Sequence, residues 1–147
     1  MAYKKILVCL DGSPLAEAAI PHAQILASDD EAEIVLLRVS VDPAAEFSFS
    51  DPSIANNFIQ DMEAETLSYM QSARSTLQKA GCRTSFLIRQ GAVAETILQT
   101  ASEIKADVLV MSTHGRSGIQ RWLLGSVADR IVTHSNIPVM LIRPGTS

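Results

Sequence analysis

The chain of 147 residues has little of what several protein classes depend on. Its two cysteines, Cys9 and Cys82, lie far apart and form no CxxC motif, which excludes a disulfide scaffold and a zinc knuckle and favours a reducing cytosol. No apolar run approaches the roughly 20 residues that span a bilayer, so we expect no membrane segment. The first apolar stretch stops at Asp11 and is too short for a signal peptide.

Basic charge is also scarce, since 12 Lys and Arg face 16 Asp and Glu and the net charge is −4. A nucleic-acid binder needs a basic face to neutralise phosphates, so we expect no nucleic-acid partner. Two common nucleotide signatures are missing as well. The absence of GxxxxGK[ST] excludes a Walker P-loop, and the absence of GxGxxG after the first predicted strand disfavours a dinucleotide-binding fold.

The chain does contain the composition of a globular protein, with 47% hydrophobic and 19% charged residues. Its length predicts a single domain over residues 1–147. Short apolar runs alternate with helical patterns from end to end. The predicted strands cover residues 5–10, 34–39, 84–89, 107–111 and 137–142, and the predicted helices cover about 14–27, 53–80, 93–104 and 125–133.

This alternation determines the expected fold class. Strands separated by helical crossovers run parallel, and their helices cover both faces of the sheet. We therefore predict a doubly wound α/β fold with a five-stranded parallel sheet. Pro21 predicts a kink within the first helix, and Gly81 predicts the end of the second. The helical spacing of Met62 and Met70 predicts that both side chains lie in the core.

Two strand ends carry residues suited to a ligand, because open parallel sheets bind ligands beyond the carboxyl ends of their strands. The first is the turn at Asp11, which can cap the next turn or accept a hydrogen bond from a ribose hydroxyl. The second is the loop that leads from residue 112 to a helix opening at Ser126. Gly115 and Gly125 allow close approach of a phosphate to that helix N-terminus. By spacing alone, phosphate binding and an ordinary flexible connection are equally supported.

The residues around this second loop resemble a family signature. Ser112-Thr113-His114-Gly115, nine intervening residues and Gly125-Ser126-Val127-Ala128 are similar to the G-x2-G-x9-G-[ST] pattern of nucleotide-binding members of the universal stress protein family. Residues 6–11, 35–39 and 137–142 also resemble strands of that family, so the resemblance covers the whole chain. Ser112 departs from the pattern, because it stands at the first glycine, where its Cβ restricts φ and narrows the cleft.

The resemblance implies a flavodoxin-like sheet of order 3-2-1-4-5 and a cytoplasmic homodimer formed through the C-terminal strand, with a role in the stress response. It also implies an ATP-binding regulator with Mg or Mn on the phosphates and little or slow hydrolysis. By position, Leu10 and Asp11 would lie beside adenine and ribose, Val39 would offer backbone bonds to adenine, and Met111 and Ser112 would lie near the sugar. The phosphates would be held by Gly115, Gly125, Ser126, Val127 and Ala128.

Two alternatives stay open. Ser112 favours a dimerisation or interaction module of the same family that has lost the nucleotide. The same cleft also suits a slow ATPase, although no pair of carboxylates and no Ser-His-Asp arrangement indicates a general base or a nucleophile. We therefore assign no catalytic and no metal-binding residue. In the nucleotide-binding hypothesis, ATP changes the order of loops 41–53 and 112–125, and partners recognise that change.

Overall fold

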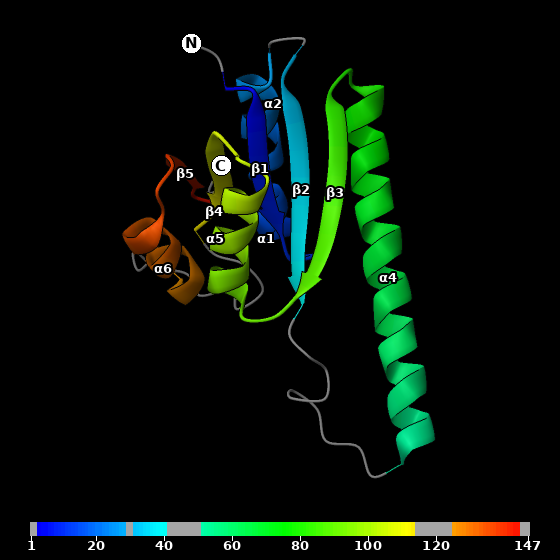
Figure 1. Cartoon of the computed structure of the whole chain (residues 1–147). Coiled ribbons are helices and arrows are strands. Elements are labelled where there is room, and N and C mark those ends of the chain that lie inside the picture. The colour runs from blue at the N-terminus through cyan, green and yellow to red at the C-terminus, as the bar shows by residue number, and fades with distance from the viewer. Residues whose placement is uncertain (1–2, 29–30, 41–50, 114–124, 145–147) are drawn as a thin grey trace.

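The computed structural model describes residues 3–28, 31–40, 51–113 and 125–144. The five strands of this part are parallel and form one sheet of order β3-β2-β1-β4-β5 (Figure 1), which confirms the predicted fold class and strand order. The elements in chain order are β1 Lys5–Leu10, α1 Pro14–Glu17, α2 Ile20–Leu26, β2 Glu33–Ser40, α4 Pro52–Lys79, β3 Arg83–Gln90, α5 Val93–Glu103, β4 Val108–Ser112, α6 Ser126–His134 and β5 Val139–Ile142.

Helices cover both faces of this sheet (Figure 1). On one face, Ile6 and Val8 of β1 belong to a buried cluster with residues of α2 and α4. On the other face, Leu7 of β1 belongs to a second cluster with residues of α5 and α6. Successive side chains of a strand point to opposite faces, and both faces of β1 are covered here. This double burial explains why the sequence of the strand is a nearly unbroken apolar run.

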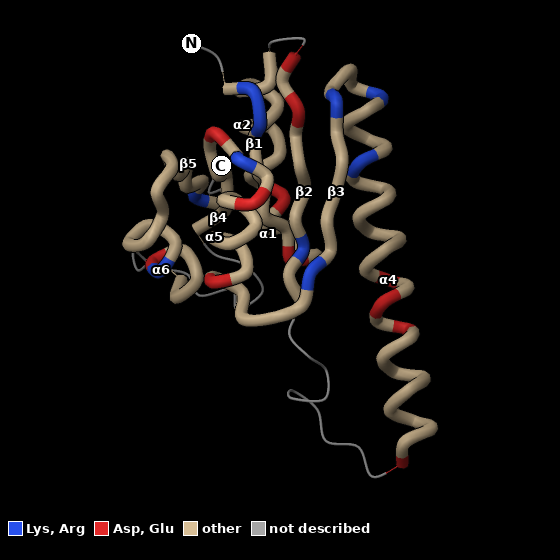
Figure 2. The backbone as a smooth tube through the Cα atoms, viewed as in Figure 1, with Lys and Arg blue, Asp and Glu red and all other residues tan. Residues whose placement is uncertain are grey.

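Two arginines lie near the carboxyl ends of neighbouring strands. Arg38 precedes the last two residues of β2, and Arg89 is the residue before the last of β3. The register pairs Arg38 with Ile88 and Val39 with Arg89, so both charges lie at the same end of the sheet, where Figure 2 shows basic positions on β2 and β3. An open parallel sheet binds its ligands beyond this end, so both charges are close to the region where a site is expected.

The segment after β1 forms two helices rather than one kinked helix, so the prediction of a continuous helix over 14–27 is wrong. Ser13 caps α1 as expected, with its Oγ accepting a hydrogen bond of 3.2 Å from the N–H of Ala16. The helix then ends at Glu17, and α2 begins at Ile20 with Pro21 in its first turn. Proline has no N–H to bond the Glu17 carbonyl and is tolerated in a first turn, so it separates the helices instead of bending one.

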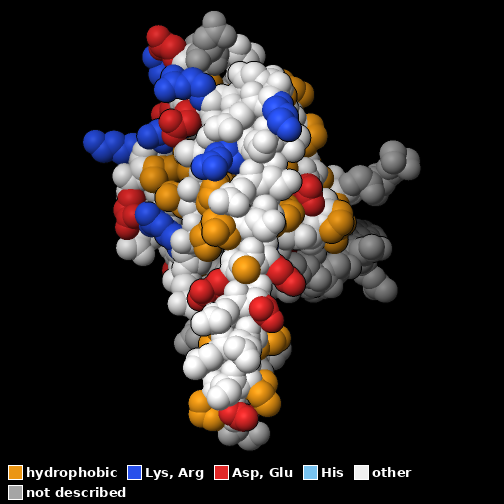
Figure 3. All heavy atoms as spheres, turned by 90° about the vertical axis from the view of Figure 1, so that its right-hand side faces the viewer, with side chains coloured by type: hydrophobic (Ala, Val, Ile, Leu, Met, Phe, Trp, Pro, Cys, Tyr) orange, Lys and Arg blue, Asp and Glu red, His pale blue; other side chains and the backbone are white. Residues whose placement is uncertain are grey.

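Helix α4 is 28 residues long and extends past the carboxyl ends of β2 and β3 (Figure 1). Figure 3 views the molecule with this helix in front and shows its N-terminal half projecting beyond the body of the protein. Gly81, at φ +93°, follows the helix as predicted, and the N–H of Cys82 donates to the Leu77 carbonyl in a Schellman motif. No helix in the described residues, α4 included, is apolar enough over a sufficient length to cross a membrane.

The buried residues of α4, Met70 and Leu77, both lie in its C-terminal half. Met70 is in the core, as predicted, with 0% of its surface exposed. The same prediction for Met62 is wrong, because this residue is only partly buried and lies where the helix leaves the sheet. Helical periodicity identified the correct face of α4, but that face is covered over only part of its length.

Candidate functional site

A cavity of about 640 Å³ lies beyond the carboxyl ends of β1, β2 and β4. It is at the topological switch point of the sheet, since the chain continues from β1 to β2 on one side and β4 lies on the other. Helices α4, α5 and α6 contribute side walls. Its described lining residues are Cys9, Leu10, Asp11, Ala16, Leu37, Arg38, Val39, Ser40, Met62, Thr66, Val93, Ile97, Met111, Ser112, Thr113, Gly125, Ser126, Val127 and Ala128.

The cavity brings together nine of the ten residues that the sequence singled out. They come from four separate segments of the chain and all line this one space: Leu10, Asp11, Val39, Met111, Ser112, Gly125, Ser126, Val127 and Ala128. Gly115 lies outside the described residues, as do His114 and most of the two loops expected to respond to a ligand. The ligand contacts of all ten residues stay a prediction.

The N-terminus of α6 forms one wall of the cavity. Gly125 is the N-cap residue and makes no side-chain cap, so the first-turn N–H groups of the helix have no such partner. The Gly125 N–H donates to the Thr113 carbonyl over 3.1 Å, and a Cβ on Gly125 would meet that oxygen at 3.0 Å. The absence of a side chain therefore lets α6 start directly against the end of β4. Helix dipole and N–H groups make this wall favourable for an anion.

Ser112 does not strain the end of β4. It is the last residue of the strand, and its side chain is buried, with 7% of its surface exposed. Among the described non-glycine residues only Lys105 has a positive φ. The concern that a side chain restricts φ at this position therefore does not apply, because the strand requires only the extended backbone that serine adopts readily.

Asp11 follows β1 and holds the turn into α1. Its Oδ1 accepts hydrogen bonds from the Ser13 N–H at 2.9 Å and the Ser13 hydroxyl at 2.6 Å. This is the capping role that the sequence left open. Asp11 also lines the cavity, so the structure is compatible with a second role toward a ligand.

Several lining residues were missed by the sequence interpretation. The sequence placed Met62 of α4 and Val93 and Ile97 of α5 on apolar helix faces, but it did not predict that they line a cavity. Thr66 of α4 was given no role. Arg38 was missed because the family resemblance pointed only to the next residue, Val39, whose side chain lies on the opposite face of β2. The only signal for Arg38 was a charged residue directly after the apolar run 34–37, which is rare in a strand buried on both faces.

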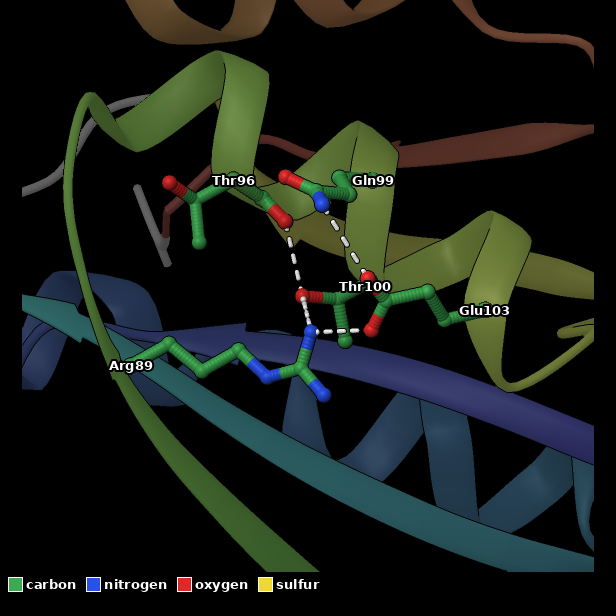
Figure 4. A network of polar contacts seen from close by, with 5 residues as sticks. All are labelled: Arg89, Thr96, Gln99, Thr100 and Glu103. Carbon is green, nitrogen blue, oxygen red and sulfur yellow. Dashed lines mark hydrogen bonds and ion pairs between the residues drawn. The ribbon is translucent and has the colours of Figure 1, made fainter.

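A polar network holds α5, which supplies Val93 and Ile97 to the cavity, against β3 (Figure 4). Arg89 donates to the Thr100 hydroxyl at 3.1 Å and to the Glu103 carboxylate at 2.6 Å. Thr100 in turn donates to the Thr96 carbonyl at 2.7 Å. The hydrogen bond from Arg89 lowers the pKa of Glu103, so this pair is charged at neutral pH.

Cys9 lines the cavity as an unreactive thiol. Burial raises its pKa to about 12, because a thiolate is poorly solvated between the packed layers. The side chain therefore contributes apolar surface rather than a nucleophile. In the described part of the chain, no group of three His, Cys, Asp or Glu side chains is arranged to hold a metal ion.

The fold and the cavity together define the class of protein. It is a doubly wound, flavodoxin-like α/β protein with a cavity beyond the carboxyl ends of its strands, where proteins of this class bind ligands. The model of the universal stress protein family matches residues 2–143. The chain therefore belongs to the universal stress protein family, as the signature in the sequence predicted.

Three solved structures are similar over nearly the whole chain. Protein MJ0577 of Methanocaldococcus jannaschii has a TM-score of 0.88 at 26% identity, covering 100% of both chains. A universal stress protein in complex with cAMP has a TM-score of 0.72 at 23% identity, covering 99% of this chain and 100% of that one. A family member from Arabidopsis thaliana with AMP bound has a TM-score of 0.71 at 20% identity, covering 97% and 93%. At 23% and 20% identity, the last two comparisons show that the fold is similar.

Proposed function

We propose that this protein binds ATP or a related adenine nucleotide in the cavity at the switch point and acts as a regulatory module. The observation that carries the proposal is the N-terminus of α6 in the cavity wall, where the N-cap residue Gly125 has no side chain to cap the first-turn N–H groups. A site of this kind favours a phosphate through hydrogen bonds and the helix dipole. The cavity is otherwise lined by many apolar groups, as suits the flat faces of a purine.

In this proposal the phosphates lie at one end of the cavity and the nucleoside at the other. Ser126, Val127 and Ala128 bind the phosphates together with Gly125 and with Gly115 from the neighbouring loop. Leu10 and Asp11 contact adenine and ribose, Val39 offers its backbone to adenine, and Met111 and Ser112 lie near the sugar. Family members that carry AMP or cAMP have the same fold, which supports an adenine nucleotide as the ligand.

A divalent ion enters the proposal as a partner of the ligand. Mg or Mn would be held chiefly by the phosphates, because these ions prefer oxygen ligands and retain water. When bound, the ion neutralises phosphate charge. The protein contributes the α6 N-terminus and the Ser126 hydroxyl on the same side. We propose binding with little or slow hydrolysis, because the cavity lining contains no arrangement of a nucleophile with a base among the described residues.

The test is calorimetric titration of Mg-ATP into nucleotide-stripped protein. Ser126 is exposed at the first position of α6, so Ser126→Asp places a negative charge where the phosphates bind while remaining compatible with the helix. We expect this variant to bind ATP at least about tenfold more weakly, a change of about 1.4 kcal/mol. The matched control Ser126→Asn has nearly the same shape without the charge and should retain most of the affinity. Absence of heat at millimolar ATP with the wild-type fold intact would refute the proposal.

Ser112 favours a second candidate, an interaction module of the same family without nucleotide. A serine side chain occupies space at the end of β4 that a glycine leaves open. Mass spectrometry of the purified protein separates the candidates, because stoichiometric ATP or AMP that co-purifies would exclude the second. Turnover of ATP well above background, lost in Asp11→Ala, would instead support a slow ATPase.

We also propose a cytoplasmic homodimer formed through β5. In the described part of the chain this strand pairs with β4 along one edge, and its four residues Val139–Ile142 are all only partly buried. An uncovered apolar edge strand invites pairing with another chain. Sedimentation that shows only monomer at micromolar concentration would contradict this interface.

A further inference from the structure

The side chain of Arg38 leaves β2 toward α4 and the turn after β1. Its neighbours Leu37 and Val39 pack with the cluster under α5 and α6, whereas Leu36 packs with the cluster under α2 and α4. Alternation along the strand places Arg38 on the Leu36 side. There its guanidinium lies over the ring of Tyr69, with Cζ 5.9 Å from the ring centroid. Arg38 lines the cavity at the same time.

Gly12 and Arg38 share a close contact. Gly12 has a φ of +87°, and a Cβ built on it would lie 2.5 Å from Nη1 of Arg38. The guanidinium therefore occupies the space that the side chain of any other residue would require. Ser13 therefore stabilises the turn that carries Asp11 through hydrogen bonds within the turn. Arg38 of the neighbouring strand packs against the same turn at Gly12.

Tyr69 completes this contact from α4. Its hydroxyl is buried and makes no hydrogen bond of good geometry to the described residues. Burial and the negative charge of Glu17 raise the pKa of Tyr69 to about 12, while the nearby Arg38 acts in the opposite direction and Asp11 adds a smaller increase. These electrostatic effects agree with the geometry: β2, α4 and the turn after β1 bring Arg38, Tyr69 and Asp11 into one group beside the cavity.

We propose that Arg38 is a positioning residue that holds the Asp11 turn and so determines the preference of the site for ribose over deoxyribose. The inference rests on the proposed function, in which Asp11 accepts a hydrogen bond from a ribose hydroxyl. Asp11 is partly buried, and an acceptor shielded from water that loses its hydroxyl partner disfavours the deoxy ligand, but only when the acceptor is held in place. Arg38 supplies that constraint through its packing on Gly12, and Tyr69 supports the guanidinium by a cation–π contact.

The experiment compares ATP with its 2′-deoxy and 3′-deoxy analogues by calorimetry. For the wild type we expect at least one analogue to bind at least about tenfold more weakly than ATP. In Arg38→Met, ATP binding should weaken about five- to tenfold while binding of that analogue changes less than about twofold, so the ratio approaches one. Arg38→Lys keeps the charge and most of the stem, and its ratio should be intermediate. It also provides the measurement if Arg38→Met does not fold.

Arg74 offers a matched control, since its guanidinium lies 4.8 Å from the centroid of the Phe86 ring in a similar contact. It does not line the cavity, so Arg74→Met should leave the affinities for ATP and both analogues unchanged. Equal weakening of ATP and the analogue in both Arg38 variants would overturn the inference, as would an unchanged ratio. A wild type that binds ATP and both analogues equally would overturn it while leaving nucleotide binding intact. A wild type that binds none of them would refute the proposed function as well.

Discussion

Two methionines on α4 provide a quantitative test of how this helix is attached to the protein. Met70 is completely buried under the sheet, whereas Met62 is partly exposed and lines the cavity. Met70→Ala removes Cγ, Sδ and Cε from the core. At about 0.8 kcal/mol for each buried group of methylene size, transfer alone costs about 2.4 kcal/mol. The residual cavity increases the expected loss of unfolding free energy to about 3 kcal/mol.

Urea denaturation followed by circular dichroism measures this loss directly. A loss of about 3 kcal/mol corresponds to a decrease in Tm of about 6–12 °C for a domain of this size. Met62→Ala is the matched control on the same helix and should cost less than about 1 kcal/mol, because most of its surface change occurs at an open cavity. Equal losses for the two variants, or a loss below about 1 kcal/mol for Met70→Ala, would refute the packing described for α4.

Three further predictions concern single side chains. Burial raises the pKa of Cys9 to about 12. Its thiolate fraction at pH 8 is therefore about 10⁻⁴, and iodoacetamide should leave Cys9 unmodified in native protein analysed by mass spectrometry; full labelling would contradict this. Because Arg89 lowers the pKa of Glu103, the ionised carboxylate stabilises the fold above its ordinary pKa and loses this effect as the pH falls. The difference in Tm between wild type and Glu103→Gln should shrink on acidification, and a difference independent of pH would be inconsistent with the ion pair. Tyr69→Phe removes a buried hydroxyl that makes no hydrogen bond of good geometry to the described residues, so the unfolding free energy should stay unchanged or rise by up to about 1 kcal/mol, and a clear decrease would reveal a partner in solution.

Much of the secondary structure followed from local pattern. The strand predicted over 5–10 is β1, and the helix predicted over 53–80 is α4 at Pro52–Lys79. These elements have either an uninterrupted apolar run or a long helical period, and both are bounded by a glycine. At Pro21 the local pattern predicted a kink, whereas the chain forms a break between two helices. The pattern does not distinguish the two, because the energetic cost of each depends on how the flanking turns pack.

The alternation of strands and helices determined that the sheet is parallel, but not the order of its strands. Helical crossovers can connect parallel strands in several spatial orders, so the order 3-2-1-4-5 depended on the resemblance to a family. The site residues depended on it too. Spacing of Gly115, Gly125 and Ser126 identified the loop, and the structure adds that the described members of the set line one cavity.

The sequence by itself determined most of the strands and helices, their apolar faces, and that a helix N-terminus follows the fourth strand, but not the break between α1 and α2. Only the tertiary structure decided that α4 overhangs the sheet, which places Met62 at a cavity instead of in the core. It also decided that Arg38 meets Gly12 and Tyr69, which are far from it in sequence. The physical reason is that hydrophobic periodicity specifies which face of an element is buried, whereas the neighbour that covers the face depends on how all the elements pack together.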